Sequence, residues 1–338
     1  MLEERKKRVL QAIVEIYIQT AEPVSSNAIM NLEGLEYSSA TIRNEMAELE
    51  KMGYIEKPHT SAGRVPSAKG YRYYVDELLQ EDKITLEEIK YISDKLETKV
   101  NELEDLTKIT SSTISEITHY TTVSIGPNSN VQKIENIKFV LLSPRMMMAV
   151  VLTDAGLVKE TIIKFDEDIT ENQVQTLSYM FNNKLKGEPV TKIDKPLEKY
   201  LVEEMSYSVK LIKPIIEQMK KIVEEESIHL EGAGQLFELP EFNSLEVAKN
   251  FVNILDEKDL MADMLNTGLA KDINVYIGEE NEKEELKDFS VVTFRHRIGN
   301  KDMGTIGIIG PKRMDYAKVI SVMKYISKKL NGNNEEDK

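Results

Sequence analysis

The feature that most constrains the fold is a capped helix followed directly by a short strand and a turn-rich loop. Ser38 or Ser39 can accept the first unpaired backbone N–H groups of this helix. Its apolar residues recur at helical spacing, and Gly53 provides a C-terminal stop. Residues 54–58 then predict a strand, and residues 59–67 contain the turn formers of a loop. This order predicts a helical domain that carries a wing.

Two helices precede the capped helix. Residues 2–17 have apolar side chains at helical spacing, so a first helix should end ahead of Pro23. Ser25 or Ser26 can cap a short second helix through about Met30. Three helices and a wing predict a winged helix, in which the second and third helices form a helix-turn-helix.

The outer face of the third helix carries side chains that suit DNA. Short hydroxyls can bind phosphates, whereas Arg and Asn can pair bidentately with the edges of guanine and adenine. A Gly-containing wing can follow the phosphates or enter the minor groove. The same pattern also occurs in domains that do not bind DNA, where such side chains are only solvated. The candidate DNA-contacting residues are Ser39, Thr41, Arg43 and Asn44 on the helix, and Lys57, Arg64, Lys69 and Arg72 around the wing.

The charge distribution decides how an acidic chain can approach DNA. The 338 residues carry a net charge of −14, and a polyanion repels an acidic protein. Residues 1–75 are neutral, however, with ten Lys or Arg and ten Asp or Glu. Residues 57–75 contain four cationic side chains and no acidic one. A local basic patch on an acidic protein is the electrostatic pattern expected of a DNA-binding domain.

The remainder of the chain predicts a helical linker followed by two blocks of strands. Residues 80–120 have apolar side chains at helical spacing, which suits either a coiled-coil dimer seam or a helix that packs on its own domain. A helical segment at about 168–241 separates the two blocks, so a domain inserted into a split sheet domain explains the order. Strands are expected at 137–142, 145–152 and 157–165 as an antiparallel meander, and again at 273–277, 290–297 and 305–309, ahead of a helix over 316–330.

The sequence offers no catalytic constellation. It has no cysteine and four scattered histidines, which excludes disulfides, thiol chemistry and Cys-ligated metals. We therefore expect no enzymatic activity, no metal and no cofactor. No export signal or membrane-spanning apolar run is visible, which predicts a cytoplasmic protein without membrane contact. His296 lies between two arginines and suits either an anion site or an outward-facing position on a strand, whereas Glu279 and Glu280 suit a solvated charge run.

Two parts of the sequence resemble one known family of transcription repressors. The N-terminal segments Pro23–Ser26 (PVSS), Tyr37–Glu50 (YSSATIRNEMAELE), Gly53–Ile55 (GYI) and His59–Arg72 (HTSAGRVPSAKGYR) are similar to the DNA-binding domain of the heat-inducible transcription repressor family HrcA. The C-terminal segment Gly304–Tyr316 (GTIGIIGPKRMDY) is similar to a signature of the same family. The resemblance therefore brackets nearly the whole chain.

The resemblance implies a function and a set of partners. A member of this family represses chaperone operons by binding double-stranded DNA at an inverted-repeat operator, the CIRCE element, and it releases the operator on heat stress. A homodimer matches the symmetry of such an operator. The family also implies dependence on the chaperonin GroEL for active repressor. The alternative is a metabolite-sensing regulator whose sheet domain binds a small effector.

The fold that the resemblance implies is of the α+β class. A GAF-like antiparallel-sheet domain follows the winged helix and a linker helix, and a helical dimerisation domain is inserted into it. The expected boundaries are 1–78 for the winged helix, 79–120 for the linker helix region, 121–167 and 242–338 for the two parts of the GAF-like domain, and 168–241 for the inserted domain.

Overall fold

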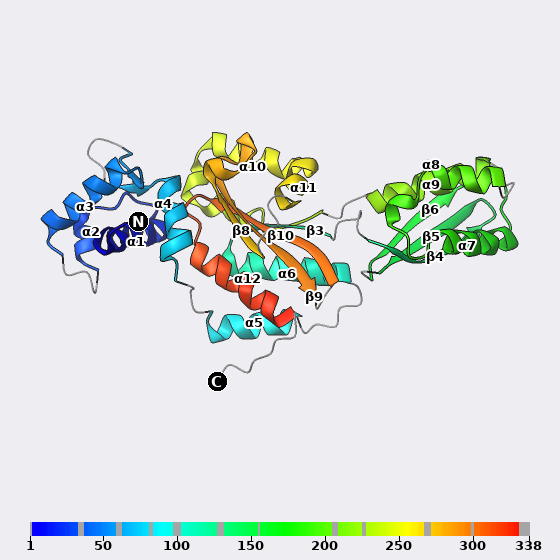
Figure 1. Cartoon of the computed structure of the whole chain (residues 1–338), viewed down its shortest axis with the longest axis horizontal. Helices are drawn as coiled ribbons and strands as arrows, with labels where there is room; N and C mark the ends of the chain where they lie inside the picture. The colour runs from blue at the N-terminus through cyan, green and yellow to red at the C-terminus, as the bar shows by residue number, and fades with distance from the viewer. Residues whose placement is uncertain are drawn as a thin grey trace.

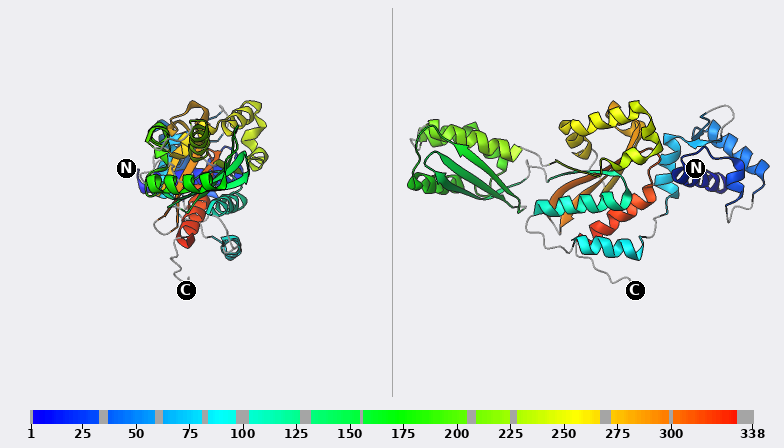
Figure 2. Two further views of the ribbon diagram at one scale, coloured as in Figure 1. Left: turned by 90° about the vertical axis from the view of Figure 1, so that its right-hand side faces the viewer. Right: turned by 180° about the vertical axis from the view of Figure 1, so that it is seen from behind.

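Three parts of the chain follow one another along the longest axis of the molecule in the computed structural model (Figure 1). An N-terminal helical domain lies at one end, a sheet domain in the centre, and a smaller sheet unit at the other end, as the turned views of Figure 2 also show. The structure describes residues 2–32, 37–58, 63–80, 84–96, 103–126, 132–154, 156–204, 209–224, 228–266, 272–298 and 301–330.

The N-terminal domain is a winged helix, as predicted. Ser25 and Ser38 cap α2 and α3 with their side chains, and Gly53 has a φ of +78°, a left-handed conformation that ends α3 at little steric cost. The expected wing is present as the antiparallel pair of β1 and β2, although residues 59–62 at its tip lie outside the described part of the chain. The elements are α1 (Glu4–Thr20), α2 (Ser26–Met30), α3 (Ser39–Lys51), β1 (Ile55–Glu56), β2 (Val65–Pro66), α4 (Ala68–Tyr73) and the π-helix η1 (Tyr74–Leu78).

The central domain is built on a five-stranded antiparallel sheet of order β7-β3-β10-β9-β8. Figure 1 shows α10 and α11 over one face of this sheet and α6 and α12 over the other. The strands are β3 (Thr121–Ile125), β7 (Ile228–Glu231), β8 (Ile273–Ile277), β9 (Phe289–Ile298) and β10 (Lys301–Pro311). The helices are α5 (Leu86–Leu96), α6 (Leu103–Thr118), α10 (Leu245–Asp256), α11 (Lys258–Asn266) and α12 (Tyr316–Leu330), with the short 3-10 turns η5 (Gln235–Glu238), η6 (Pro240–Asn243), η7 (Gly278–Glu280) and η8 (Glu284–Leu286).

The expected linker helix consists of two helices that belong to the central domain. α5 packs on α6, and α6 packs on β3 and α12. Ile114 and the neighbouring hydroxyl-bearing residues of α6 are buried in this contact. Of the two alternatives for residues 80–120, the described parts of α5 and α6 agree with helices that pack on their own domain.

The distal unit has its own sheet and its own hydrophobic core. The sheet has the order β4-β5-β6, and residues such as Phe139, Phe181 and Ile215 form a buried cluster separate from that of the central domain. The expected meander is thus present, but its assignment to the first part of the central sheet domain is wrong, because within the described ranges these strands pair only with one another. The expected boundary at residue 168 falls inside this unit. Its elements are β4 (Ile134–Ser143), β5 (Met146–Thr153), β6 (Val158–Lys164), α7 (Glu171–Leu185), α8 (Lys195–Lys199) and α9 (Val209–Glu224), with the short helices η3 (Val190–Lys192) and η4 (Tyr200–Glu204).

The distal unit occupies the turn of a hairpin of the central sheet. β3 ends at Ile125 and β7 begins at Ile228, and these two residues are direct partners in the antiparallel pair. Residues 126–227 therefore leave and re-enter the sheet at one point. The strands β3 and β7 were not predicted from the sequence, yet they are the pair that carries the insertion.

The free edge of β4 is closed by two side chains of α7. The Asn182 side chain accepts a hydrogen bond from the Ile137 N–H at 2.8 Å and donates one to the carbonyl of the same residue, while the Ser178 hydroxyl accepts from the Phe139 N–H at 3.0 Å. These groups satisfy backbone atoms that would otherwise be open to pairing with another chain.

We expect Asn182→Ala to lower the free energy of unfolding by about 1–3 kcal/mol, because it leaves the buried edge of β4 without its partners. Urea unfolding monitored by circular dichroism measures this change. Asn183 is the matched control, since it is the next residue of the same helix and is exposed. Equal losses in Asn182→Ala and Asn183→Ala would show that the edge contact contributes nothing.

Candidate nucleic-acid interface

The first turn of α3 presents a row of hydroxyl groups on the domain surface. The Ser38 Oγ accepts the backbone N–H of Thr41 at 3.1 Å and lies 2.8 Å from the Thr41 Oγ1. The Ser39 Oγ lies 3.4 Å from the Ser26 Oγ of α2. The predicted Ser39 and Thr41 thus lie together at the N-terminus of the helix, where the backbone N–H groups and the helix dipole favour an anion.

Arg43 and Asn44 lie on the exposed face of the same helix. The Arg43 Nε donates a hydrogen bond to the Ser26 Oγ at 3.2 Å, which orients the guanidinium and leaves its two terminal nitrogens on the surface. The Asn44 amide has no hydrogen-bond partner among the described residues, so both its donor and its acceptor are available. Ser26 was not a sequence candidate, because only the fold brings α2 against α3.

An ion-pair network fixes α3 on α1. The Lys6 Nζ lies 2.8 Å from the Glu48 Oε2 and 3.3 Å from the Glu45 Oε2, and the Arg5 Nη1 lies 3.5 Å from the Glu45 Oε1. The hydrogen bond from Lys6 lowers the pKa of Glu48, and the same contact raises the pKa of Lys6. The cations of α1 thus neutralise two carboxylates of α3 that would repel a phosphate backbone. Sequence reasoning missed this network because its partners lie on different helices.

The wing is fastened to the rest of the domain at Arg64. Its backbone N–H and carbonyl pair with those of Val24, both at 2.8 Å, and its Nη2 lies 2.7 Å from the Glu50 Oε2. A Cβ at the preceding Gly63 would lie 2.4 Å from the Val24 carbonyl oxygen, so only glycine permits this close approach. Arg64 therefore holds the wing against α3, and its side chain is already paired.

The two lysines around the wing differ in what they contact. The Lys69 Nζ donates to the Met52 carbonyl at 2.8 Å and lies 4.4 Å from the centre of the Tyr54 ring. Its charge therefore caps the C-terminus of α3, the negative end of the helix dipole. Lys57, which follows β1, is exposed and has no ion-pair partner within the described ranges. Of the two, Lys57 is the one whose charge is available to a phosphate.

Arg72 does not lie with the other candidates. Its Nε donates to the Glu280 Oε1 at 2.8 Å, its Nη2 donates to the Val275 carbonyl at 2.6 Å, and its Nη1 lies 3.2 Å from the Asp76 Oδ1. Glu280 and Val275 belong to the central domain. The expected phosphate contact of Arg72 therefore needs correction, because this side chain joins the winged helix to the central domain.

Two other sequence interpretations need correction. Glu280 is not a solvated charge, since it receives Arg72 and accepts the Ile277 N–H at 2.9 Å. His296 is fully buried on β9, and burial lowers its pKa to about 4. A neutral, inaccessible imidazole offers no anion site.

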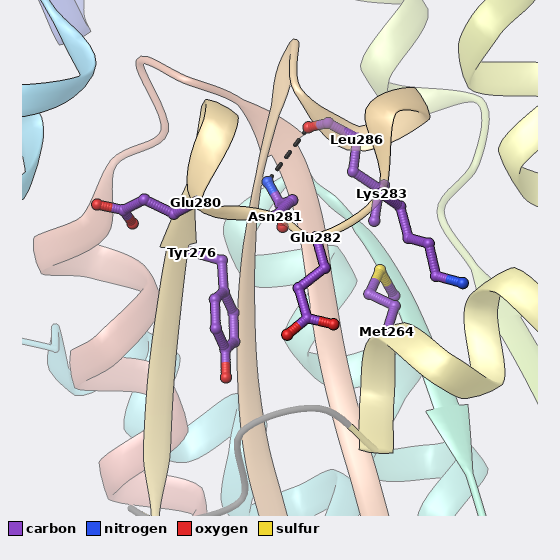
Figure 3. Close-up of a pocket in the computed structure, with 7 residues that line it drawn as sticks. All are labelled: Met264, Tyr276, Glu280, Asn281, Glu282, Lys283 and Leu286. Atoms are coloured by element: carbon purple, nitrogen blue, oxygen red, sulfur yellow. Dashed lines mark hydrogen bonds between the residues drawn. The ribbon is translucent and has the colours of Figure 1, made fainter.

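A pocket of the central domain beside β8 is too small for a metabolite. It has a volume of about 30 Å³, which is roughly the space that one water molecule fills. Figure 3 shows its lining residues, Met264, Tyr276, Glu280, Asn281, Glu282, Lys283 and Leu286. Within the described part of the chain, His, Asp and Glu side chains form no cluster suited to a metal, and no helix has the length and hydropathy to span a membrane.

Comparison with known proteins agrees with this geometry. Residues 1–78 match the model of the family "Winged helix-turn-helix transcription repressor, HrcA DNA-binding", and residues 104–320 match "HrcA protein C terminal domain". The heat-inducible transcription repressors HrcA of Ruminiclostridium cellulolyticum and Acetivibrio thermocellus are each 39% identical to this chain. The alignments cover 98% and 97% of this chain and 97% and 95% of the relatives. A crystal structure described as that of a hypothetical protein superposes with a TM-score of 0.65 at 25% identity, covering 98% of both chains.

A capped, exposed helix and a wing on a sheet domain define the class of winged-helix DNA-binding transcription regulators. Within that class, the two family matches and the full-length relatives are specific. The chain belongs to the HrcA family of heat-inducible transcription repressors.

Proposed function

We propose that the protein represses chaperone operons by binding an inverted-repeat operator of the CIRCE type as a homodimer, in the cytoplasm. The observation that carries this proposal is the exposed pair Arg43 and Asn44 beside the hydroxyls of the α3 N-terminus. In this proposal α3 enters the major groove, where Arg43 contacts guanine and Asn44 contacts adenine. Ser39, Thr41 and Lys57 contact phosphates, with Arg64 and Lys69 at the border of the same surface.

The distal unit is proposed as the dimerisation domain, and the central domain as the GAF-like domain. The outer face of the β4-β5-β6 sheet supports this assignment, because it carries several apolar side chains and has no covering layer among the described residues. Ile162 is 52% exposed and Val158 45% exposed. A stable monomer rarely leaves such a face in water, whereas an isologous dimer buries it. The apolar residues of this face are Val140 of β4, Met148, Val150 and Leu152 of β5, and Val158 and Ile162 of β6, while Lys138 and Glu160 flank Val150 on the same face.

Release on heat stress and dependence on a chaperonin are proposed from the way in which the central sheet is assembled. β3 pairs with β7 and β10, and both partners lie far along the chain. Non-local strand pairing folds slowly and leaves apolar surface exposed before it is complete. A chain with this topology is a suitable client for GroEL, and loss of chaperonin capacity to heat-damaged proteins would lower the amount of active repressor.

The base contacts are tested by substitutions on α3. We expect Arg43→Ala and Asn44→Ala each to weaken binding to the inverted repeat by about 1–3 kcal/mol, with little effect on random duplex, because they remove bidentate base contacts. Titration of both duplexes at several salt concentrations measures this. Lys57→Ala is the comparison: it should weaken both duplexes and reduce the salt slope by about one. Equal losses on both duplexes for Arg43→Ala would rule out base reading.

A further inference from the structure

We propose that Arg72 and Arg313 are positioning residues that hold the winged helix on the central domain in one orientation, so that the dimer selects one spacing between operator half-sites. This inference rests on the proposed function, since spacing matters only to a protein that binds two half-sites at once. We call the contacts of these two arginines the domain clamp.

On one side of the domain clamp, Arg72 of α4 reaches into the central domain. Its guanidinium binds both carboxylate oxygens of Glu280 and also the carbonyl of Val275 in the edge strand β8. A planar guanidinium held by a bidentate carboxylate and a carbonyl has little freedom to rotate. This contact therefore restrains the orientation of α4 relative to β8 as well as the distance between them.

The carboxylate of Glu280 is held in position for its contact with Arg72. Its carboxylate accepts the Ile277 N–H at 2.9 Å, and the next residue, Asn281, donates to the carbonyls of Gly278 at 2.8 Å and Leu286 at 3.2 Å. Figure 3 shows Asn281 bonded to Leu286 and the Glu280 carboxylate pointing away from the small pocket. The loop after β8 thus presents a pre-oriented carboxylate to α4.

On the other side of the domain clamp, Arg313 of the central domain reaches into the winged helix. Its Nη1 donates to the Ile18 carbonyl at 2.9 Å, and its Nε and Nη2 bind the two oxygens of Glu241. Ile18 lies in the last turn of α1, where carbonyls have no partner within the helix. Arg313 is 11% exposed and so caps a helix of the neighbouring domain from a largely buried position.

The two arginines act beside the hydrophobic contact of the winged helix and the central domain, which an open cleft interrupts. The Tyr71 and Tyr316 rings meet between the domains with centroids 6.0 Å apart, and both residues are buried. Beside them lies a cleft of about 600 Å³, which Lys69 and Glu56 line from the winged helix and Arg313 lines from the central domain. An aromatic contact beside an open cleft lets one domain rotate against the other. Two directional contacts, one from each domain, prevent this rotation.

The placement of the domain clamp explains why it bears on half-site spacing. Figure 1 shows α2 and α3 on the side of the winged helix away from the central domain, with α4 between them and that domain, and the rear view in Figure 2 agrees. A small rotation at α4 therefore becomes a larger displacement at α3. In a dimer, each recognition helix then has one fixed position relative to the two-fold axis.

The test measures operator affinity as a function of spacing. Insertion of one base pair between half-sites moves them apart by about 3.4 Å and rotates one against the other by about 34°. We expect the unchanged protein to lose at least about tenfold in affinity when one or two base pairs are inserted. The double variant Arg72→Gln, Arg313→Gln should lose less than about threefold in affinity on insertion. It should bind the original spacing about tenfold more weakly than the unchanged protein, because the winged helix is no longer held in the binding orientation before it meets DNA.

A matched control and a milder variant separate orientation from folding. Arg145→Gln removes an exposed Arg–carboxylate pair, with Asp168 at 2.7 Å, far from the interface, and should keep the spacing profile of the unchanged protein. Glu280→Gln retains an acceptor for the Ile277 N–H but loses the charge that binds Arg72, and should flatten the profile partially. It provides the same test should the double variant fail to fold by circular dichroism.

Domain orientation can also be measured without DNA. The chain has no cysteine, so Gln19→Cys and Lys249→Cys allow two spin labels, one on each domain, in labelled chains diluted with unlabelled ones. A narrow distance distribution should broaden in the double variant.

An unchanged spacing profile in both variants overturns the inference, whatever the distances show. Equal affinity of the unchanged protein for one half-site and for the inverted repeat would instead overturn the proposed function itself.

Discussion

Replacing residues 126–227 with an Asn-Gly turn is expected to leave a folded but monomeric protein that binds the operator between about a hundredfold and ten-thousandfold more weakly. The two ends of the deletion, Ile125 and Ile228, are direct partners across β3 and β7, so a two-residue turn can join them. The core of the central domain is unaffected, because the distal unit packs its own hydrophobic cluster. What should disappear is the second half-site contact, which dimerisation supplies in the proposed function.

Sedimentation velocity and operator titration measure this result, and a point substitution in the full chain supports it. Ile162→Lys places a charge among the apolar side chains on the outer face of the distal sheet and should dissociate the proposed dimer. Tyr179→Lys is the control, because Tyr179 is 68% exposed but lies on α7, away from that face. If the shortened chain still sediments as a dimer, the dimer interface lies elsewhere.

Acidification from pH 7 to pH 4 is expected to remove about 3 kcal/mol of unfolding free energy through His296 alone. The side chain is fully buried, and neither ring nitrogen has a hydrogen-bond partner among the described residues. Burial lowers its pKa from 6.5 to about 4. Between these values the unfolded chain binds a proton that the folded chain does not. The stability is therefore complete above pH 6.5 and is lost as the pH falls towards 4.

Urea unfolding at pH 7, 5 and 4 measures this dependence. His296→Phe keeps an aromatic ring at the site without a titrating group. On acidification from pH 7 to pH 4, the variant should therefore lose about 3 kcal/mol less unfolding free energy than the unchanged protein. His119→Asn is the control, since His119 is exposed and its φ of +58° is one that Asn tolerates. Parallel curves for His296→Phe and the unchanged protein would assign the acid sensitivity to other groups.

Local signals made the winged helix predictable, whereas long-range pairing did not. Ser25, Ser38 and Gly53 act on the helix that each one borders, so their roles can be identified without knowing the rest of the fold. β3 escaped prediction because its sequence, TTVSI, is short and rich in hydroxyls and is buried on both faces. The membership of strands in two separate sheets depends on pairings between distant segments, which hydrophobic periodicity cannot assign.

The candidate DNA-contacting residues also separate into those that local sequence places correctly and those that depend on distant segments. Ser39, Thr41, Arg43 and Asn44 share one helix, so helical spacing alone places them together. The wing cations differ because each has a different neighbour in space. Arg72 meets Glu280, which is 208 positions away in the sequence, and a charge pattern contains no information about that meeting. The sequence identifies the cations, but it does not show which of them are already paired with other groups of the protein.

The hydrophobic cluster that the winged helix shares with the central domain has a consequence for thermal stability. Leu10, Ile42 and Tyr71 belong to the same contiguous cluster as Phe289 and Tyr316, whereas the distal unit is outside it. Elements that share a core melt together, while a separate core can melt at its own temperature. Calorimetry should therefore resolve two transitions, and α3 should be lost in the one that melts the central sheet. In the proposed function, heat would then abolish the DNA-binding surface without a dedicated sensor, because α3 is only as stable as the domain on which it rests.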